Sequence, residues 1–340
     1  MRLQANALID NTLQLTARAA YLAKITHASE LPRLCRHYAS LPAPPLVLGS
    51  GSNVVFCHDY PGLVLQFTSQ KIRLLCSDTE YVTVRVGAGL NWHALVRWCL
   101  SMGYHGLENL ALIPGKVGAA PIQNIGAYGV ELATFVVAVG VFDTQQQSYT
   151  ALPAKACNFG YRDSRFKAEP GRWLITHVDL QLRRHAQPEI SYPALRNCLA
   201  TDHPQPKQIF DSVVKLRRRR LPDPRLIPNV GSFFKNPVTS QEFAEDLRRE
   251  LPDLSSFPMA NGQCKLAAAQ LIEECGLRGY SEGRVMVSNQ HALVITATNG
   301  ANGSEVVALA RTIRERVFRR WRVRLDPEPR LIGADWSEIW

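Results

Sequence analysis

The sequence predicts an α+β fold, and three observations point to it. The first half of the chain contains short apolar runs separated by glycine turns, a pattern typical of strands. The last third contains longer segments whose apolar residues recur at helical spacing. Because the two kinds of segment do not alternate regularly, the pattern disfavours a doubly wound parallel sheet.

Strands are expected where a short apolar run stands between turn residues. Residues 81–86 alternate around Thr83 and Arg85, which indicates a half-exposed strand. Residues 132–142 form the longest apolar run, and we expect a buried strand there. The other expected strands are 45–48, 54–56, 63–67, 285–287 and 293–296.

Four segments combine helical spacing with residues that begin or end helices. The first follows Asn91, a suitable N-cap, and ends at Gly103; the second ends in four arginines before Pro222. The third ends at Gly276, and the fourth is expected to begin at Ser304. Their apolar positions are Leu95, Cys99 and Met102; Ile209, Val213 and Leu216; Leu266, Ala269, Ile272 and Cys275; and Val306, Leu309, Ile313 and Val317.

Two further signals concern organisation. Residues 188–206 are punctuated by prolines and form a candidate boundary region. Thr239 and Glu242 have the spacing of a capping box, which predicts a helix start in the last third.

Composition limits the class of protein. The chain has 340 residues, 39 Lys+Arg and 29 Asp+Glu, a formal net charge of +10, and 46% hydrophobic residues. A chain of this length is expected to form two or three domains with ample cores. No apolar run reaches the ~18 residues of a membrane helix, and no signal-peptide core follows the N-terminus. Membrane, fibrous and small secreted classes are therefore excluded, and the charge predicts an anionic partner.

Cysteines and histidines give no support for a metal site. No two of the eight cysteines lie closer than the eleven positions between Cys264 and Cys275, and the nine histidines form no HxxxH or HxH pair. Without a secretion signal, we expect a reduced, cytoplasmic protein whose cysteines are mostly small buried apolar residues.

The first candidate functional segment is Gly-Ser-Gly-Ser-Asn at 49–53, directly after an expected strand. Glycines let the backbone approach a ligand, and successive N–H groups can hold phosphate oxygens. The order is not GxGxxG and no helix follows, which disfavours a dinucleotide-binding Rossmann fold. On this segment alone, a tight turn between strands is the favoured interpretation.

The second segment, residues 106–131, contains five glycines and two prolines with little charge. Such a composition forms poor helices and poor strands, so we expect a shaped loop that exposes backbone N–H and C=O groups. This loop suits a planar cofactor with polar edges and a diphosphate. A purely structural loop of this length inside a compact domain would be unusual, which favours function.

Three other groups of residues are ambiguous on their own. Ser232 stands between a glycine and two aromatics, and three interpretations are open: a nucleophile, a proton donor or a turn residue. The GxSxG motif of serine hydrolases is absent, because Phe234 stands where its second glycine belongs. Arg162 in Tyr-Arg-Asp-Ser is either a bidentate clamp for a substrate carboxylate or a surface-turn residue, and Asp-Pro-Glu-Pro at 326–329 is also usually a surface turn. The arginines at 217–220 fit a solvated helix end, and no interleaved aromatics support a nucleic-acid patch.

Taken together and in order, these segments resemble the UDP-N-acetylenolpyruvoylglucosamine reductase family, flavoenzymes of bacterial peptidoglycan precursor synthesis. The resemblance runs from residue 48 to residue 333, and the Tyr-Arg-Asp segment with Tyr192 looks like the longer class of the family. The motifs that carry it are LGSGSNVVF (48–56), GLENLALIPG (106–115), PIQNIGAYGVE (121–131), GYRDSRFK (160–167), LPDP (221–224), GSFFKNP (231–237), KLAAAQLIEECG (265–276) and PEPRLIG (327–333).

The resemblance implies the vanillyl-alcohol-oxidase type of FAD-binding fold, also called the PCMH type, with a C-terminal α+β substrate domain. The implied division is 1–67 with 321–340 as the first FAD-binding lobe, 68–220 as the second, and 221–320 as the substrate-binding domain. The implied FAD-binding residues are Gly49, Ser50, Gly51, Ser52, Asn53, Gly115, Gly118, Ala119, Gln123, Asn124 and Gly126.

The implied reaction is ping-pong: NADPH gives hydride to the flavin, which then reduces the enolpyruvyl ether of UDP-N-acetylglucosamine to UDP-N-acetylmuramate. Ser232 matches the proton donor, whereas Arg162 and Glu328 match residues that hold the carboxylate and stabilise developing charge. The implied partners are NADPH and the UDP-sugar, with no nucleic acid and no membrane, and a monomer is expected. Substrate contacts match Tyr161, Tyr192, Arg220, Asn236 and Gln290.

The chain departs from the family pattern at four positions. Arg220 stands where lysine is usual, Pro228 and Val230 flank Asn229 where smaller residues are common, and Lys116 replaces a small residue of the FAD loop. Two alternative functions remain from the residues: another flavin oxidoreductase of the same fold, such as an alcohol oxidase, and a basic nucleic-acid-binding protein. Neither a flavin-linking residue nor an aromatic-rich basic patch marks them.

Overall fold

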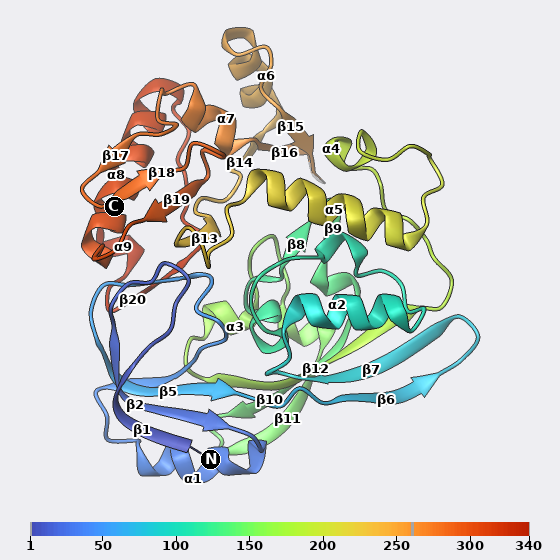
Figure 1. The fold of residues 1–340 in the computed structure, drawn as a ribbon, viewed down its shortest axis with the longest axis vertical. Coiled ribbons are helices and arrows are strands. Elements are labelled where there is room, and N and C mark those ends of the chain that lie inside the picture. Colours follow the sequence, from blue (N-terminus) through green and yellow to red (C-terminus); the bar gives the residue numbers. More distant parts are fainter. Residues whose placement is uncertain (1, 260–261, 340) are drawn as a thin grey trace. The chain divides into compact units, whose positions relative to one another are not determined.

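The computed structural model describes residues 2–259 and 262–339, which form two compact units (Figure 1). Unit 1 comprises Met1–Leu8, Arg18–Gly51 and Tyr60–Arg218. Unit 2 comprises Ile9–Ala17, Ser52–Asp59 and Arg219–Trp340. Helices and largely antiparallel sheets occur in both units, which confirms the predicted α+β class. The finer division at residues 67, 220 and 320 stays a prediction.

The first sheet of unit 1 has the order β1-β2-β5-β3. β2 runs antiparallel to β1 and parallel to β5, and β3 is also parallel to β5. Helix α1 (Leu31–His37) buries Leu31 and Leu34 against Ile25 and Leu65 of the sheet. The strands are β1 (Arg2–Leu8), β2 (Arg18–Ile25), β3 (Ala43–Val47) and β5 (Tyr60–Phe67).

The second sheet of unit 1 is antiparallel throughout, with the order β11-β10-β12-β7-β6. Helices α2 (Trp92–Ser101) and α5 (Pro206–Arg220) contribute Leu95 and Val213 to the core on one face of this sheet (Figure 1). The strands are β6 (Ile72–Ser77), β7 (Tyr81–Gly87), β10 (Val136–Asp143), β11 (Ser148–Pro153) and β12 (Trp173–Arg183). Single-turn helices α3 (Arg165–Ala168) and α4 (Pro193–Arg196) follow β11 and β12 along the chain.

Unit 2 contains three small sheets around one core. The long helix α8 (Gly303–Trp321) buries Leu309, Ile313 and Val317 in that core. The sheets are β13 (Asn229–Ser232), β19 (Val294–Ala297), β18 (Val285–Val287) and β17 (Ser281–Glu282); β14 (Val238–Ser240), β16 (Gln263–Leu266) and β15 (Ser256–Pro258); and β4 (Val54–Phe56) with β20 (Arg330–Ile332). The other helices are α6 (Gln241–Glu250), α7 (Ala268–Glu273) and α9 (Trp336–Ile339).

Several predicted elements are confirmed. The Asn91 side chain caps α2, accepting a hydrogen bond from the Ala94 N–H at 3.0 Å. The strands expected at 54–56 and 285–287 have those bounds, and the helix with Ile209, Val213 and Leu216 ends at Arg220.

Other boundaries were predicted wrongly by one or a few residues. The cap of α8 is Asn302, not Ser304, and the cap of α6 is Ser240, not Thr239. Leu266 belongs to β16 and not to α7.

Burial was misjudged at Thr83 and Met102 because the tertiary packing determines it, and the start of one strand was misplaced. Thr83 is buried inside β7, where Val86 and its neighbours also lie inside, so that strand is not half-exposed. Met102 is exposed at the end of α2. The apolar run from residue 132 begins with a 3-10 turn, Leu132–Thr134, before β10 starts at Val136.

Within the described part of the chain, no helix has both the length and the apolar character that crossing a bilayer requires. All eight cysteines are free thiols. Cys76 and Cys198 are exposed, whereas four of the others are buried.

Candidate functional site

The start of the first glycine segment predicted to bind a cofactor, Gly49, meets the second glycine segment in unit 1. A Cβ on Gly49 would lie 3.5 Å from the Ala119 Cβ, so the turn after β3 contacts the loop. A Cβ on Gly118 would lie 2.6 Å from the Ala88 Cβ, and the Gly118 N–H donates to the Ala88 carbonyl at 3.0 Å. Gly118 therefore allows the loop to approach the end of β7 closely.

The loop itself has little regular structure. Its centre is a 3-10 turn, Val117–Gln123, which is followed by the two-residue strands β8 (Gly126–Ala127) and β9 (Val130–Glu131). The Gly115 carbonyl accepts the Trp92 N–H at 3.1 Å, which ties the start of the loop to the first turn of α2.

Lys116 places a positive charge beside the Gly49 turn. A Cβ on Gly49 would lie 3.7 Å from the Lys116 Cβ, and the Lys116 ammonium donates to the Phe67 carbonyl at 3.3 Å. Burial, and then the neighbouring Lys24 charge, lower the pKa of Lys116. An anionic group near this lysine would offset both effects, so the residues present fit a diphosphate-bearing cofactor such as FAD.

The predicted Tyr161–Arg162 turn is bound to the same loop. The Arg162 Nη2 donates to the Gly126 carbonyl at 2.7 Å, and the Ser164 hydroxyl donates to the Ile122 carbonyl at 2.7 Å. Arg162 has a left-handed backbone, φ 54°, and its guanidinium lies 5.5 Å from the Tyr161 ring centroid. The structure thus brings Arg162 and the predicted FAD loop together within unit 1.

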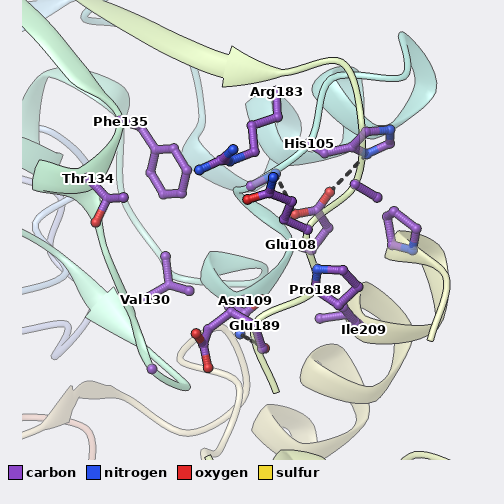
Figure 2. Close-up of a pocket in the computed structure, with 15 residues that line it drawn as sticks. His105, Glu108, Asn109, Val130, Thr134, Phe135, Arg183, Pro188, Glu189 and Ile209 are labelled. Atoms are coloured by element: carbon purple, nitrogen blue, oxygen red, sulfur yellow. Dashed lines mark hydrogen bonds and ion pairs between the residues drawn. The ribbon is translucent and has the colours of Figure 1, made fainter. Parts of the chain in front are cut away.

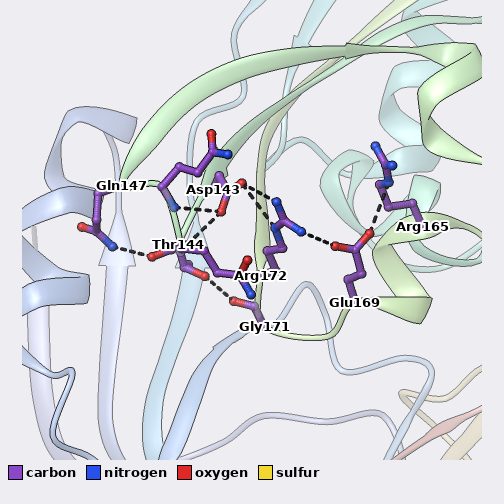
Figure 3. Close-up of polar contacts among 9 residues, drawn as sticks. Asp143, Thr144, Gln147, Arg165, Glu169, Gly171 and Arg172 are labelled. Carbon is purple, nitrogen blue, oxygen red and sulfur yellow. Dashed lines mark hydrogen bonds and ion pairs between the residues drawn. The ribbon is translucent and has the colours of Figure 1, made fainter.

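An ion-pair network holds the segment that follows this turn (Figure 3). Arg172 donates to the Asp143 carboxylate at 3.1 and 3.3 Å and to Glu169 at 2.7 Å, and Glu169 also pairs with Arg165 of α3 at 3.2 Å. Burial alone raises the pKa of Asp143, but the Arg172 guanidinium and two backbone N–H groups outweigh burial and lower it. Asp143 therefore stays ionised and anchors α3 to the end of β10.

In unit 2, Ser232 ends a distorted strand. β13 pairs with β19 through Asn229 and Ser232, with an irregularity between them, and Gly231 has φ 75°. The buried Asn229 side chain accepts the Gly231 N–H at 2.8 Å and so fixes the kink. Ser232 is half-buried at the end of this kink.

Glu328 and Asn53 lie next to the Ser232 segment. The Glu328 N–H donates to the carbonyl of Phe233, the residue after Ser232, at 2.8 Å. The Asn53 amide donates to the Glu328 carbonyl at 3.3 Å, and the Asn53 carbonyl accepts the Arg330 N–H at 3.0 Å. Two predicted catalytic residues and one predicted cofactor residue therefore gather within unit 2, whereas Arg162 belongs to unit 1.

The predicted substrate residues are dispersed over both units. Tyr192 precedes α4 and meets Tyr128 edge-on, with ring centroids 5.3 Å apart. In unit 2, Arg220 ends α5, Gln290 is exposed, and the Asn236 Oδ1 accepts the Ala268 N–H of α7 at 3.1 Å.

A cavity of about 380 Å³ in unit 1 is lined partly by the loop predicted at 106–131 and partly by residues outside it, such as His105, Arg183 and Glu189, that were not predicted to form a site (Figure 2). In its wall, buried Glu108 accepts hydrogen bonds from the Gly106 N–H at 2.7 Å and from the His105 ring at 3.2 Å. The buried Asn109 amide donates to the carbonyls of Tyr128 and Glu189, each at 2.8 Å. Asn109 thus connects the cavity wall to the tyrosine that contacts Tyr192.

His291 is a second residue missed from the sequence. Burial, followed by the charges of Arg220 and Arg278, lowers the pKa of His291 to about 4. Its Nδ1 accepts the Leu293 N–H at 3.2 Å, consistent with a neutral ring. The sequence around this histidine gives no signal of such burial, because neighbouring elements supply it.

Comparisons with known proteins identify the family. A FAD binding domain model matches residues 19–146, and a model of the C-terminal domain of UDP-N-acetylenolpyruvoylglucosamine reductase matches residues 223–332. A UDP-N-acetylenolpyruvoylglucosamine reductase of Xylella fastidiosa (strain M12) is 44% identical over 96% of this chain and 94% of its own. This chain belongs to the UDP-N-acetylenolpyruvoylglucosamine reductase family.

Further matches agree with this family. A UDP-N-acetylenolpyruvoylglucosamine reductase of Xanthomonas axonopodis pv. citri (strain 306) is 43% identical over 96% of this chain and 94% of its own. The crystal structure of the reductase from Thermus caldophilus superposes with a TM-score of 0.67 at 25% identity, covering 97% of this chain and 99% of that one. The predicted fold, a FAD-binding part followed by the C-terminal domain of this reductase family, is confirmed.

Proposed function

We propose that the protein reduces UDP-N-acetylenolpyruvoylglucosamine to UDP-N-acetylmuramate with NADPH through bound FAD, as a monomer of the longer family class in the cytoplasm. Membership of the reductase family is the observation that carries this proposal. The contact between the Gly49 turn and the loop beside Lys116 supports a diphosphate-bearing cofactor in unit 1.

When bound, FAD would supply a two-electron carrier that accepts hydride from NADPH and passes hydride to the substrate. In this proposal, backbone N–H groups of residues 49–53 hold the diphosphate, and the loop from Gly115 to Gly126 wraps the cofactor. Lys116 adds a half-buried positive charge at the same place. The cradle therefore contributes binding and orientation, and no chemical step requires an acidic or basic side chain there.

The reducing step needs polarisation of the substrate and one proton. In this proposal, the Arg162 guanidinium binds the substrate carboxylate, which is conjugated to the alkene and takes up charge as hydride reaches C3. Glu328 is assigned to the same step by the family resemblance alone. Ser232 gives its hydroxyl proton to C2, so the C=C bond gains one hydride and one proton while NADPH becomes NADP⁺. A serine is a weak acid in water, so its contribution depends on position, which the kink at Gly231 provides.

The remaining residues would recognise the UDP-sugar. Asn236 uses its Oδ1 to accept the Ala268 N–H, which leaves its amide N–H groups to donate to an anionic or carbonyl oxygen. Arg220 offers a guanidinium fork for phosphate oxygens, which differs from the point charge of the usual lysine. Tyr161, Tyr192 and Gln290 complete the proposed contacts.

An absorbance spectrum of the purified protein tests this function directly. We expect flavin absorbance that bleaches anaerobically with NADPH and returns when the enolpyruvyl substrate is added. A colourless protein that cannot be reconstituted with FAD would contradict the proposal. Oxidation of an alcohol with O₂, without reoxidation by the enolpyruvyl substrate, would favour an alcohol oxidase of the same fold.

The Ser232→Ala variant tests the proton donor. The first half-reaction, flavin reduction by NADPH, should stay near the wild-type rate because no substrate proton is needed. The second half-reaction should fall by about 10²–10⁴-fold, the usual contribution of a positioned general acid. Stopped-flow absorbance measures both halves, and an equal loss in the two would indicate a structural role for Ser232.

A further inference from the structure

Asn124 is fully engaged inside unit 1, although it lies in the predicted FAD loop. Its residue is 1% exposed and its backbone is left-handed, φ 44°. The side-chain amide donates to the Glu131 carboxylate at 2.8 Å and to the Gly160 carbonyl at 3.1 Å. Its Oδ1 accepts the Ala133 N–H at 2.8 Å. These contacts direct the side chain into the protein and not toward a ligand.

The contact with Gly160 reaches the segment that carries Arg162. Gly160 begins the turn, and Arg162 at φ 54° is held in a conformation that non-glycine residues adopt at a cost. From Arg162, a hydrogen bond of 2.7 Å returns to the Gly126 carbonyl, two residues beyond Asn124. A Cβ on Gly126 would lie 3.1 Å from the Arg162 Nη1, so the guanidinium lies directly against that glycine.

The loop and the turn are therefore joined by two reciprocal hydrogen bonds, Asn124 to Gly160 and Arg162 to Gly126. We infer that Asn124 is a positioning residue for Arg162 and does not bind FAD through its side chain. The inference rests on the proposed function, in which Arg162 holds the substrate carboxylate. Without the amide, the turn can relax from its costly backbone and move the guanidinium, and displacements of about 1 Å cost roughly 10²-fold in rate.

The variant Asn124→Gly isolates the side chain. Glycine adopts positive φ readily, so the substitution keeps the backbone conformation and removes only the three hydrogen bonds. Asn6→Gly is the matched control, because Asn6 has φ 45° in the same unit but is exposed in β1. In the holoenzyme of Asn124→Gly, we expect wild-type FAD content, flavin reduction by NADPH within about twofold of wild type, and reoxidation by the enolpyruvyl substrate slowed about 10- to 100-fold. Asn6→Gly should match the wild type in all three.

A second variant removes the bond to Gly160 in a different way. In Asn124→Asp with Glu131→Gln, the glutamine amide donates to the aspartate and the Ala133 N–H keeps its acceptor, whereas a carboxylate oxygen replaces the amide group that donates to the Gly160 carbonyl. The same selective slowing of the second half-reaction is expected. In an Arg162→Lys background, Asn124→Gly should add less than about twofold, because residues that act through one group are not additive.

Three results would overturn the inference: loss of FAD, an equal fall in both half-reactions, or full additivity with Arg162→Lys. Unchanged reoxidation in both Asn124 variants would also overturn it. The two proposals fail differently. If the wild-type protein does not pass electrons from NADPH to the enolpyruvyl substrate, the proposed function fails; if it does and the Asn124 variants behave like Asn6→Gly, only the positioning role fails.

Discussion

At the scale of single residues, the buried His291 ring makes the folding stability depend on pH. Burial and two arginines lower the pKa of its ring from 6.5 to about 4. Below pH 6.5 the unfolded chain therefore takes up a proton that the folded chain resists, and stability falls as the pH drops toward 4. Above pH 6.5 neither state is protonated, and the group contributes no slope.

The His291→Asn variant should remove this pH dependence. The asparagine oxygen can still accept the Leu293 N–H, but it does not titrate. Between about pH 6 and pH 4, the wild type should lose up to about 1.4 kcal/mol of unfolding free energy per pH unit relative to the variant. Urea unfolding at several pH values measures the difference, and parallel stability curves for the two proteins would contradict the prediction.

A site residue could be predicted from the sequence where its role depends on local composition, and not where it depends on contacts made by folding. The two glycine segments were recognisable because glycine-rich composition directly reflects close backbone approach, as at Gly118. Ser232, Glu328 and Arg162 became candidates mainly through resemblance, since a serine or arginine alone does not distinguish a site from a turn. Asn109 lies in the predicted loop but was not singled out, and His291 was not found, because Glu189 and Arg220, which act on them, come from other parts of the chain.

At the scale of elements, the start of α8 is a specific test of capping. The Asn302 side-chain oxygen accepts a hydrogen bond from the Glu305 N–H at 3.0 Å, and the Glu305 carboxylate accepts one from the Asn302 N–H at 2.9 Å. Asn302→Ala should therefore lower the unfolding free energy by about 1 kcal/mol. Ser304→Ala is the matched control and should change it by less than about 0.5 kcal/mol, because Ser304 is exposed inside the helix. Chemical denaturation measures both, and a larger loss for Ser304→Ala would show that the helix begins later.

The same element shows why boundaries are harder to predict than the elements themselves. The apolar spacing of Val306, Leu309 and Ile313 identified α8, because the spacing is local and repeated. Two residues near its start can cap a helix, and the choice between them depends on a distant segment: a Cβ on Gly303 would lie 2.2 Å from the Phe56 carbonyl. Only a glycine fits at that position, which follows the Asn302 cap directly.

At the scale of the whole molecule, the net charge of +10 is the remaining global feature. In the proposed function, NADPH and the UDP-sugar are both anionic, so the field of the protein should favour their encounter. A nucleic-acid-binding protein would also be basic, but its affinity would depend on many phosphate contacts and fall steeply with salt. The reductase interpretation predicts that kcat/KM for NADPH depends on ionic strength, whereas the nucleic-acid interpretation predicts that the affinity for DNA or RNA does.

We predict that raising the salt from about 50 mM to about 500 mM lowers kcat/KM for NADPH several-fold and leaves kcat nearly unchanged. Screening acts on the encounter of separate charges, whereas hydride transfer within the bound complex is shielded from bulk ions. Steady-state assays over a salt series, with kcat as the internal control, measure the effect. A flat kcat/KM would mean that the excess charge is solvated surface without influence on the site. Tight, salt-sensitive binding to DNA or RNA at physiological salt would instead give the charge a different partner.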